Sequence, residues 1–356
     1  MTQMTMTTED VLANARTNGS RSWNSGAPGT SAKERLTASG AIKLNHTPKF
    51  KLDPTWPIFT VGSCFARVIE NTLIELELPV ALRGFGIPMR KYKEIKNPIN
   101  QPPNTLLRTC FNKFSVHSMT HDIKRVLEGI AYPDEGLIEL ARDKWFDPHS
   151  YHLKLASYDE AMDNRRAIHC GMLEIKNSKA VIMTLGLTET WLDTRTGLAM
   201  NEHPGGSWLA RMPDRWQFID YGYADILDEM VRMLQLIRQC TRADMKFIVT
   251  VSPIPLGATC KTQDVIVATS GSKCVLRAVA EELYRRFDFV DYFPSYECVM
   301  YSPRNITWLE DQLHVNPDIT REITRSFLLS YYSRESEIAG VPWRDRPIKG
   351  VAQLGR

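Results

Sequence analysis

Two short segments near opposite ends of the chain carry side chains capable of nucleophilic chemistry. The first, Gly62-Ser63-Cys64-Phe65-Ala66, places a hydroxyl and a thiol directly after a glycine. Glycine permits a sharp turn from a strand into a helix, and the N–H groups at a helix N-terminus stabilise an anion. Such a turn can activate a nucleophile and bind an oxyanion. Taken alone, it more simply indicates a strand-to-helix turn with Ser63 as the helix cap.

The second segment is the loop that contains Asp311 and His314. Because Asp311 lies three residues before His314, one short loop can present both side chains. A carboxylate fixes the tautomer of an imidazole, whose other nitrogen can then take a proton. The pair predicts a general base oriented by an acid. The spacing alone is a weak signal, since a surface Asp and an unrelated His produce the same pattern.

The elements around these segments alternate between strands and helices. Continuously apolar or β-prone runs predict parallel strands buried on both faces, and amphipathic runs predict helices. We expect strands at 58–61, 79–82, 180–185, 247–251 and 289–293, and helices at 65–78, 224–241, 272–287 and 318–332. This alternation predicts an α/β domain with a three-layer parallel sheet, whose reactive groups lie in loops at the carboxyl ends of the strands.

Composition divides the 356 residues into three parts. Residues 1–45 are rich in small polar residues and predict a disordered tail that can be removed. Residues 46–335 form the predicted α/β domain, with a mostly helical insertion at about 105–175. Residues 336–356 form a predicted C-terminal tail.

Charge, hydropathy and cysteine usage narrow the classes of function. A net charge of +3, from 44 basic and 41 acidic residues, gives no indication of nucleic-acid binding. No apolar run is long enough for a membrane span and no secretory signal is evident, so we expect a cytoplasmic protein. Seven cysteines without a CxxC pair indicate free thiols and no structural zinc. His117 and His121 lack a third ligand, so we expect no metal or other cofactor. The oligomeric state stays open.

Together, the two ends of the chain resemble a known family. Gly62-Ser63-Cys64-Phe65-Ala66 matches the signature of the GSCFA-domain family, a branch of the SGNH (GDSL-like) hydrolase superfamily. The resemblance continues through three segments and closes at Asp311–His314, covering roughly residues 59–329; the three segments are 184–191, 251–256 and 292–297. It implies a flavodoxin-like sheet, and its reaction class, ester hydrolysis or acyl transfer, is inherited from the superfamily.

The resemblance also implies site residues. The superfamily's Gly-Asp-Ser block places Cys64 in the nucleophile's register, whereas a shift of one residue places Ser63 there. A thiolate is intrinsically the better nucleophile, but the superfamily normally uses serine, so both stay open. Gly86 is the implied second oxyanion donor, with Gly84 as its alternative.

A third block departs from the superfamily pattern. Gly186 and Thr188 stand where Gly-x-Asn-Asp is usual, so a hydroxyl replaces an amide and ordinary esterase activity becomes less expected. Trp191 is a candidate platform for a sugar ring, and His149 is a candidate wall of the acceptor cleft; both are as readily structural.

By analogy with the superfamily, the expected substrate is a small-molecule or glycan ester, such as an O-acylated carbohydrate. A catalytically silent glycan-binding or polysaccharide-assembly protein that keeps the fold is the alternative.

Overall fold

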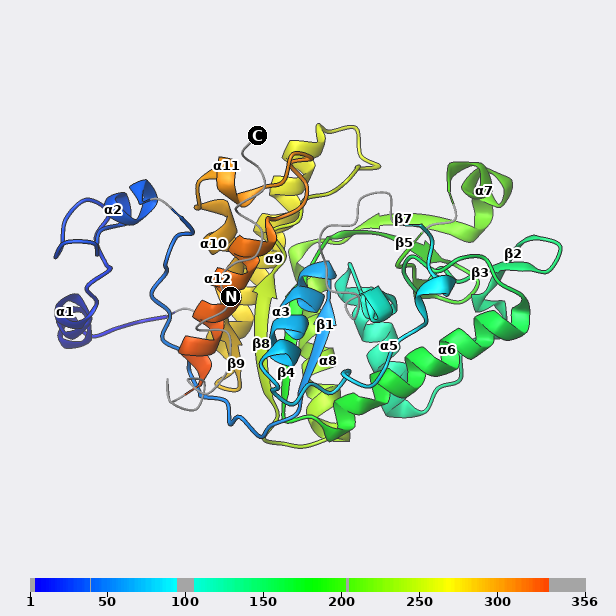
Figure 1. Cartoon of the computed structure of the whole chain (residues 1–356), viewed down its shortest axis with the longest axis horizontal. Helices are drawn as coiled ribbons and strands as arrows, with labels where there is room; N and C mark the ends of the chain where they lie inside the picture. The colour runs from blue at the N-terminus through cyan, green and yellow to red at the C-terminus, as the bar shows by residue number, and fades with distance from the viewer. Residues whose placement is uncertain (1–3, 39, 95–105, 203–204, 333–356) are drawn as a thin grey trace.

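A four-stranded parallel sheet forms the centre of the molecule (Figure 1). The computed structural model describes residues 4–38, 40–94, 106–202 and 205–332. The strands of this sheet lie in the order β1 (Ile58–Gly62), β4 (Ala180–Leu185), β8 (Lys246–Val251) and β9 (Val290–Tyr292). Because the strands are parallel and in register, their carboxyl ends meet at one edge of the sheet.

Helices cover both faces of this sheet, which explains why its strands are apolar without alternation. All residues of β1 and β4 are buried, and successive side chains point to opposite faces. On one face, Phe59 and Val181 pack with α5 (Val116–Glu128), α8 (Tyr223–Cys240) and α9 (Val265–Arg286). On the other face, Ile58 and Ile182 pack with α3 (Cys64–Glu75) and α12 (Pro317–Tyr331).

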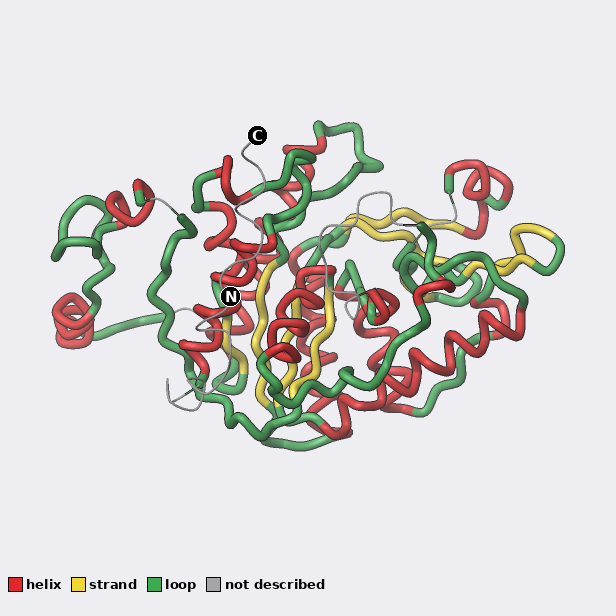
Figure 2. The backbone as a smooth tube through the Cα atoms, viewed as in Figure 1, coloured by secondary structure: helices red, strands yellow, loops and turns green. Residues whose placement is uncertain are grey.

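Smaller elements surround this core, and Figure 2 shows their distribution between helix, strand and loop. A hairpin and a three-stranded antiparallel sheet lie beyond the β1 edge; their strands are β2 (Ile138–Ala141), β3 (Lys144–Phe146), β5 (Glu189–Asp193), β6 (Leu198–Ala199) and β7 (Trp216–Asp220). The remaining helices are α1 (Thr8–Thr17), α2 (Ala32–Thr37), α6 (Tyr158–Leu173), α7 (Gly206–Arg211), α10 (Ser295–Met300) and α11 (Arg304–Thr307).

Most strands and helices expected from the sequence occur, and two segments differ. The expected strand at 79–82 is reduced to one parallel bridge between Ile58 and Val80, since the chain turns away directly afterwards. Within its described residues, the expected mostly helical segment has its two long helices at α5 and α6, with the β2–β3 hairpin between them. The predicted C-terminal tail at 336–356 lies outside the described residues.

Part of the predicted N-terminal tail contains α1 and α2, and neither helix buries a residue. Figure 1 shows both helices to one side of the sheet. Closer to the domain, Ile42 is buried, and its backbone N–H donates a hydrogen bond of 2.8 Å to the Ser302 hydroxyl. That residues 1–45 can be removed stays a prediction. Because Ile42 is buried against the domain, we expect a deletion to lower stability once it includes Ile42.

Deleting residues 1–20 should change the melting temperature by less than about 2 °C, because no side chain of α1 is buried. Ile42→Ala should lower the free energy of unfolding by about 2 kcal/mol, since it removes a buried side chain from the core. Thermal and urea unfolding measure both effects. A deletion as destabilising as the Ile42 substitution would contradict this ranking.

Candidate active site

The turn after β1 is shaped by a very close approach of two strands. Gly62 has φ +133°, and a Cβ atom at this position would lie 2.2 Å from the Thr184 carbonyl oxygen. No other residue fits there without moving β4. The Lys113 N–H donates to the Gly62 carbonyl at 2.7 Å, so a third segment is joined to the same point.

Helix α3, which begins at the turn, is held to β1 by a buried ion cluster. The Arg67 guanidinium donates to the Thr60 carbonyl at 2.6 Å and to the Glu70 carboxylate at 2.7 Å. Arg108 donates to the other oxygen of Glu70 at 2.5 Å. Since all three charged side chains are buried, this cluster fixes the start of the helix relative to the strand.

Ser63 and Cys64 have different environments at this helix N-terminus. Ser63 is the N-cap: it is buried, and its hydroxyl accepts a hydrogen bond of 3.4 Å from the Phe65 N–H. Cys64 is the first helical residue, and part of it is exposed. Both line the same cavity. The capping role proposed for Ser63 is therefore present, and Cys64 is the more accessible of the two.

Asp311 and His314 form a hydrogen-bonded pair in the loop before α12. The His314 Nδ1 lies 2.6 Å from Asp311 Oδ2, while Asp311 Oδ1 accepts backbone N–H groups of Leu313 and His314 at 3.0 Å. Partial burial opposes ionisation of Asp311, but these hydrogen bonds outweigh it and lower the pKa of the carboxyl to about 2. Asp311 is thus a carboxylate at neutral pH and holds Nδ1 protonated, which leaves Nε2 of neutral His314 able to accept a proton.

A cavity of about 660 Å³ joins the two segments. Ser63, Cys64 and His314 all line it, at the carboxyl edge of the sheet. Within the described residues, neither Ser63 nor Cys64 is hydrogen-bonded to His314. A proton passing between them would need a small movement of the His314 loop or a bridging water.

Lys273 of α9 hydrogen-bonds to Gly186, which lines the cavity with Cys64, and it carried no signal in the sequence. It is almost wholly buried, and its ammonium donates a hydrogen bond of 2.6 Å to the Gly186 carbonyl. Burial lowers the pKa of Lys273 to about 7, and Cys64 opposes this change. Burial raises the pKa of the Cys64 thiol, and Lys273 opposes that rise. The two groups therefore influence each other electrostatically, and within the described residues no hydrogen bond joins them.

Asn112 is a second residue that the sequence did not reveal. It lines the cavity and forms a parallel bridge with Gly62, next to the turn that carries Ser63 and Cys64. Its backbone carbonyl accepts a hydrogen bond of 2.7 Å from the Asn201 side chain, whereas its own side-chain oxygen is buried and has no partner among the described residues. The side-chain oxygen of Asn112 therefore takes no part in the hydrogen bonds that hold the described fold together.

Of four residues suggested by the family resemblance, two line the cavity and two do not. Gly186 and Trp191 line the cavity. Gly86 is exposed beside Leu107 and is not among the lining residues, so its predicted oxyanion role has no geometric support. The Thr188 hydroxyl donates to Asp220 at 2.6 Å and is likewise outside the lining.

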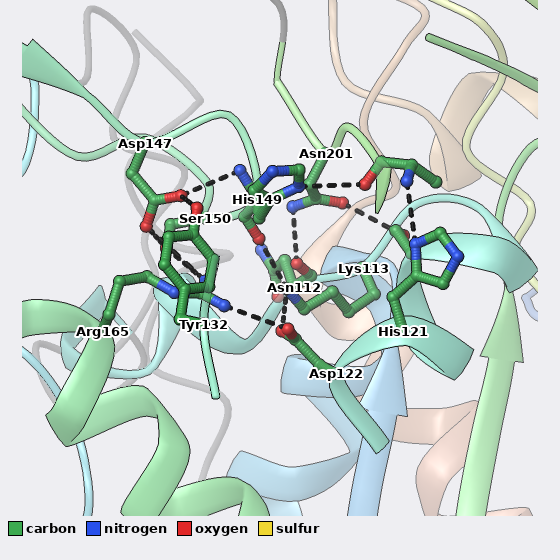
Figure 3. A network of polar contacts seen from close by, with 12 residues as sticks. Asn112, Lys113, His121, Asp122, Tyr132, Asp147, His149, Ser150, Arg165 and Asn201 are labelled. Atoms are coloured by element: carbon green, nitrogen blue, oxygen red, sulfur yellow. Dashed lines mark hydrogen bonds and ion pairs between the residues drawn. The ribbon is translucent and has the colours of Figure 1, made fainter. Parts of the chain in front are cut away.

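His149 lies behind the cavity, in a buried polar network (Figure 3). Its Nδ1 lies 3.2 Å from the Ala199 carbonyl, and its backbone N–H donates to Asp147 at 2.9 Å. Burial lowers the pKa of His149 to about 4, opposed by the neighbouring Asp147, so the imidazole is neutral. The structure does not bring His149 to the cavity wall.

The same network supports residues that do line the cavity. Asp122 is paired with Lys113 and, at 3.1 Å, with Arg165. Lys113 donates to the His149 carbonyl at 2.6 Å and directly follows Asn112. These contacts connect α5 and α6 to Asn112 (Figure 3), which lines the cavity, so the network supports that part of the lining from behind.

In the part of the chain that the structure describes, no three His, Cys, Asp or Glu side chains are grouped so as to hold a metal ion. Over the same described ranges, no helix has the length and apolar character that a membrane crossing requires.

The protein is of the α/β class. One cavity of its fold is lined by a thiol and a hydroxyl at a strand-to-helix turn and by the histidine of an Asp–His pair. A model of the GSCFA family matches residues 57–327, which is more than half of the chain. The chain therefore belongs to the GSCFA family. No curated protein matches it significantly.

Gly62→Ala should destabilise the protein by about 2–4 kcal/mol, because the added methyl group meets backbone atoms of β4. Gly84→Ala is the matched control: nothing lies within 4 Å of its Cβ position, so the change should stay within about 0.5 kcal/mol. Urea unfolding compares the two. Equal stability of both variants would show that the strand contact does not constrain this turn.

Proposed function

We propose that the protein is an ester hydrolase or O-acyltransferase of SGNH type that works through an acyl-enzyme. The observation that supports this most is that one cavity is lined by the nucleophile turn and by a His314 imidazole whose partner is an ionised Asp311. Nucleophile, base and orienting acid are the three parts that acyl transfer requires. A flavodoxin-like relation to the SGNH superfamily is part of the proposal.

In the proposed reaction, Cys64 or Ser63 attacks the ester carbonyl. His314 takes the proton of the nucleophile, and a bond forms from the nucleophile's sulfur or oxygen to the carbonyl carbon. The ester C–O bond then breaks, and the leaving oxygen takes that proton from His314. In the second half, His314 takes a proton from water or from a sugar hydroxyl, whose oxygen attacks the acyl-enzyme and releases the nucleophile. Asp311 orients His314 in this step.

Two groups near the turn are suited to stabilise the oxyanion. The backbone N–H groups at the start of α3 point along the helix axis towards the cavity end of β1. The side-chain amide of Asn112 lies beside the same turn and takes the place that Thr188 leaves open, since the Thr188 hydroxyl is bonded to Asp220.

The lining of the cavity fits a polar substrate with flat apolar faces, such as an acylated sugar. Trp191, Phe114 and Tyr151 supply aromatic surface, and Glu189 and Asn201 supply polar groups. Sugar rings commonly stack on aromatic side chains while their hydroxyls bind polar ones. The acyl group and the acceptor are not specified by this lining.

The silent glycan-binding or polysaccharide-assembly protein is the second candidate, favoured by one observation. Within the described residues, His314 Nε2 has no hydrogen bond to either candidate nucleophile. An acyl-directed fluorophosphonate or activated-ester probe separates the two: a competent site becomes covalently labelled, whereas a silent one binds glycan and stays unlabelled.

His314→Ala should reduce turnover of an activated acetyl ester roughly a thousandfold while leaving the fold intact. The loop is held by Asp311 and by backbone contacts rather than by the imidazole alone. Initial rates and circular dichroism of the same preparation test this. Retention of most activity by a folded variant would remove His314 from the mechanism.

Paired alanine variants of the turn should identify the nucleophile. If Cys64 attacks, Cys64→Ala abolishes turnover and Ser63→Ala costs about 1 kcal/mol of stability through the lost helix cap. If Ser63 attacks, the activities are reversed. Each variant is assayed on one acetyl ester after its unfolding curve has been recorded. Full activity in both variants would place the nucleophile elsewhere.

A further inference from the structure

A second cavity, of about 320 Å³, lies between α5 and α6, and we call it the α5–α6 pocket. It shares no lining residue with the cavity at the carboxyl edge of the sheet. Basic side chains predominate in its charged lining, where Asp122 is the one carboxylate among the described residues; they are Arg125, Arg165, Arg166 and His169. The rest of the wall is largely apolar and is formed by Val126, Ile130, Ala131, Met162, Ile168 and Met172.

Most buried charges beside the α5–α6 pocket have a partner of opposite sign. Asp122 pairs with Lys113 and with Arg165, and Asp147 pairs with Arg165 at 3.5 Å (Figure 3). These two cations and two carboxylates balance. Arg125 adds one more positive charge, and no ion pair joins it to a carboxylate of the described residues. The pocket wall therefore carries a positive charge that the described fold does not neutralise.

The Arg125 guanidinium is held in an unfavourable environment. The residue is only 8% exposed, and its Nη1 has no hydrogen-bond partner in the described structure. The guanidinium lies 4.5 Å from the centroid of the Tyr132 ring, and the Arg165 guanidinium lies 4.3 Å from the same centroid. The ring attracts both cations but cannot neutralise them. A buried charge without a counter-ion is costly, so this position favours an anion from outside.

The protonation states near the pocket leave the surplus close to one charge. Burial, and after it the nearby Arg165, lowers the pKa of Arg125, but an arginine stays charged at neutral pH. Burial, and after it Arg125 and Arg165, lowers the pKa of His169, so its imidazole is neutral at pH 7. Arg166 is exposed and pairs with Asp163.

We propose that the α5–α6 pocket binds a small organic acid, with its carboxylate at Arg125 and its apolar body against the walls of α5 and α6. A carboxylate brings one negative charge, which equals the surplus. A phosphate dianion would bring a second charge close to Asp122, which lines the same pocket. A volume of about 320 Å³ admits a small molecule rather than only an inorganic ion.

The ligand reaches Arg125 from the solvent-exposed side of the pocket, where Ile130 is 45% exposed. Because Arg125 Nη1 is itself shielded from solvent, the carboxylate meets the guanidinium through another nitrogen or after a rotation of the side chain. The inference does not depend on the proposed acyl transfer, since the pocket shares no residue with that site.

The test is a titration with benzoate, followed by NMR of ¹³C-labelled methionine methyl groups. Met162 and Met172 line the α5–α6 pocket, whereas Met200 lines the other cavity, so the signals report the place of binding. The Met162 and Met172 signals should shift and saturate with a Kd of about 1 mM or tighter. Benzamide has nearly the same shape without the charge and should bind about tenfold more weakly or worse.

Two variants separate the charge of Arg125 from the general basicity of the pocket. Arg125→Met should weaken benzoate binding about tenfold or more and leave benzamide binding unchanged, because the charge-assisted contact is lost. Arg166→Met is the matched control, since Arg166 lines the same pocket but is exposed and paired with Asp163. It should change the benzoate Kd by less than about threefold.

Four results would overturn the proposal. In the parent protein these are benzoate shifts at Met200 alone, equal affinity for benzoate and benzamide, and tighter binding of phenyl phosphate than of benzoate. In the variants it is a folded Arg125→Met protein with the parent affinity for benzoate. Since three of the four need only the parent protein, an Arg125→Met variant that failed to fold would still leave the proposal open to refutation.

Discussion

At Gly62 the backbone of β1 lies directly against the backbone of β4, and the cavity end of the sheet is built around that contact. A side chain here would overlap the Thr184 carbonyl, so glycine is required by space as well as by its positive φ. The Ser63 N–H donates to the same carbonyl, and Lys113 donates to the Gly62 carbonyl. Three segments that are distant in sequence are thereby fixed around the first turn of α3.

Buried charge is the second constraint on the site, and the molecule satisfies it in two ways. Glu70, Asp122 and Asp147 each have arginine or lysine partners in the described structure. Their pairing holds α3, α5 and α6 in fixed positions around the cavity. Lys273 stands apart, because its hydrogen bond in the described structure is to the Gly186 carbonyl rather than to a carboxylate.

The position of Ser63 and Cys64 gives the family signature a physical meaning. The serine caps the helix and is buried, while the cysteine begins the helix and reaches the cavity. Thr188, where the superfamily pattern has an amide, lies outside the cavity lining. Asn112, from a different segment, lies beside the turn, and Thr188 bonds to Asp220 instead.

The sequence by itself determined the sheet and the two ends of the site. Continuous apolar runs predicted β1, β4, β8 and β9 to within a residue or two, because a strand covered on both faces must be apolar throughout. The contact of Asp311 with His314 was also predictable, since the two residues lie three positions apart in the chain. The hairpin at 138–146 was missed because it is short and partly exposed, which leaves little periodic signal.

Only the tertiary structure decided which residues share the cavity. Lys273 lies in the middle of a helix, and Asn112 lies in a loop, so neither has a local pattern that distinguishes it from a surface residue. Gly86 and His149 had plausible local patterns and are not at the cavity wall. The physical reason is that burial and charge pairing depend on what packs from distant segments. The sequence determines those contacts, but no regular spacing of residue types reveals them.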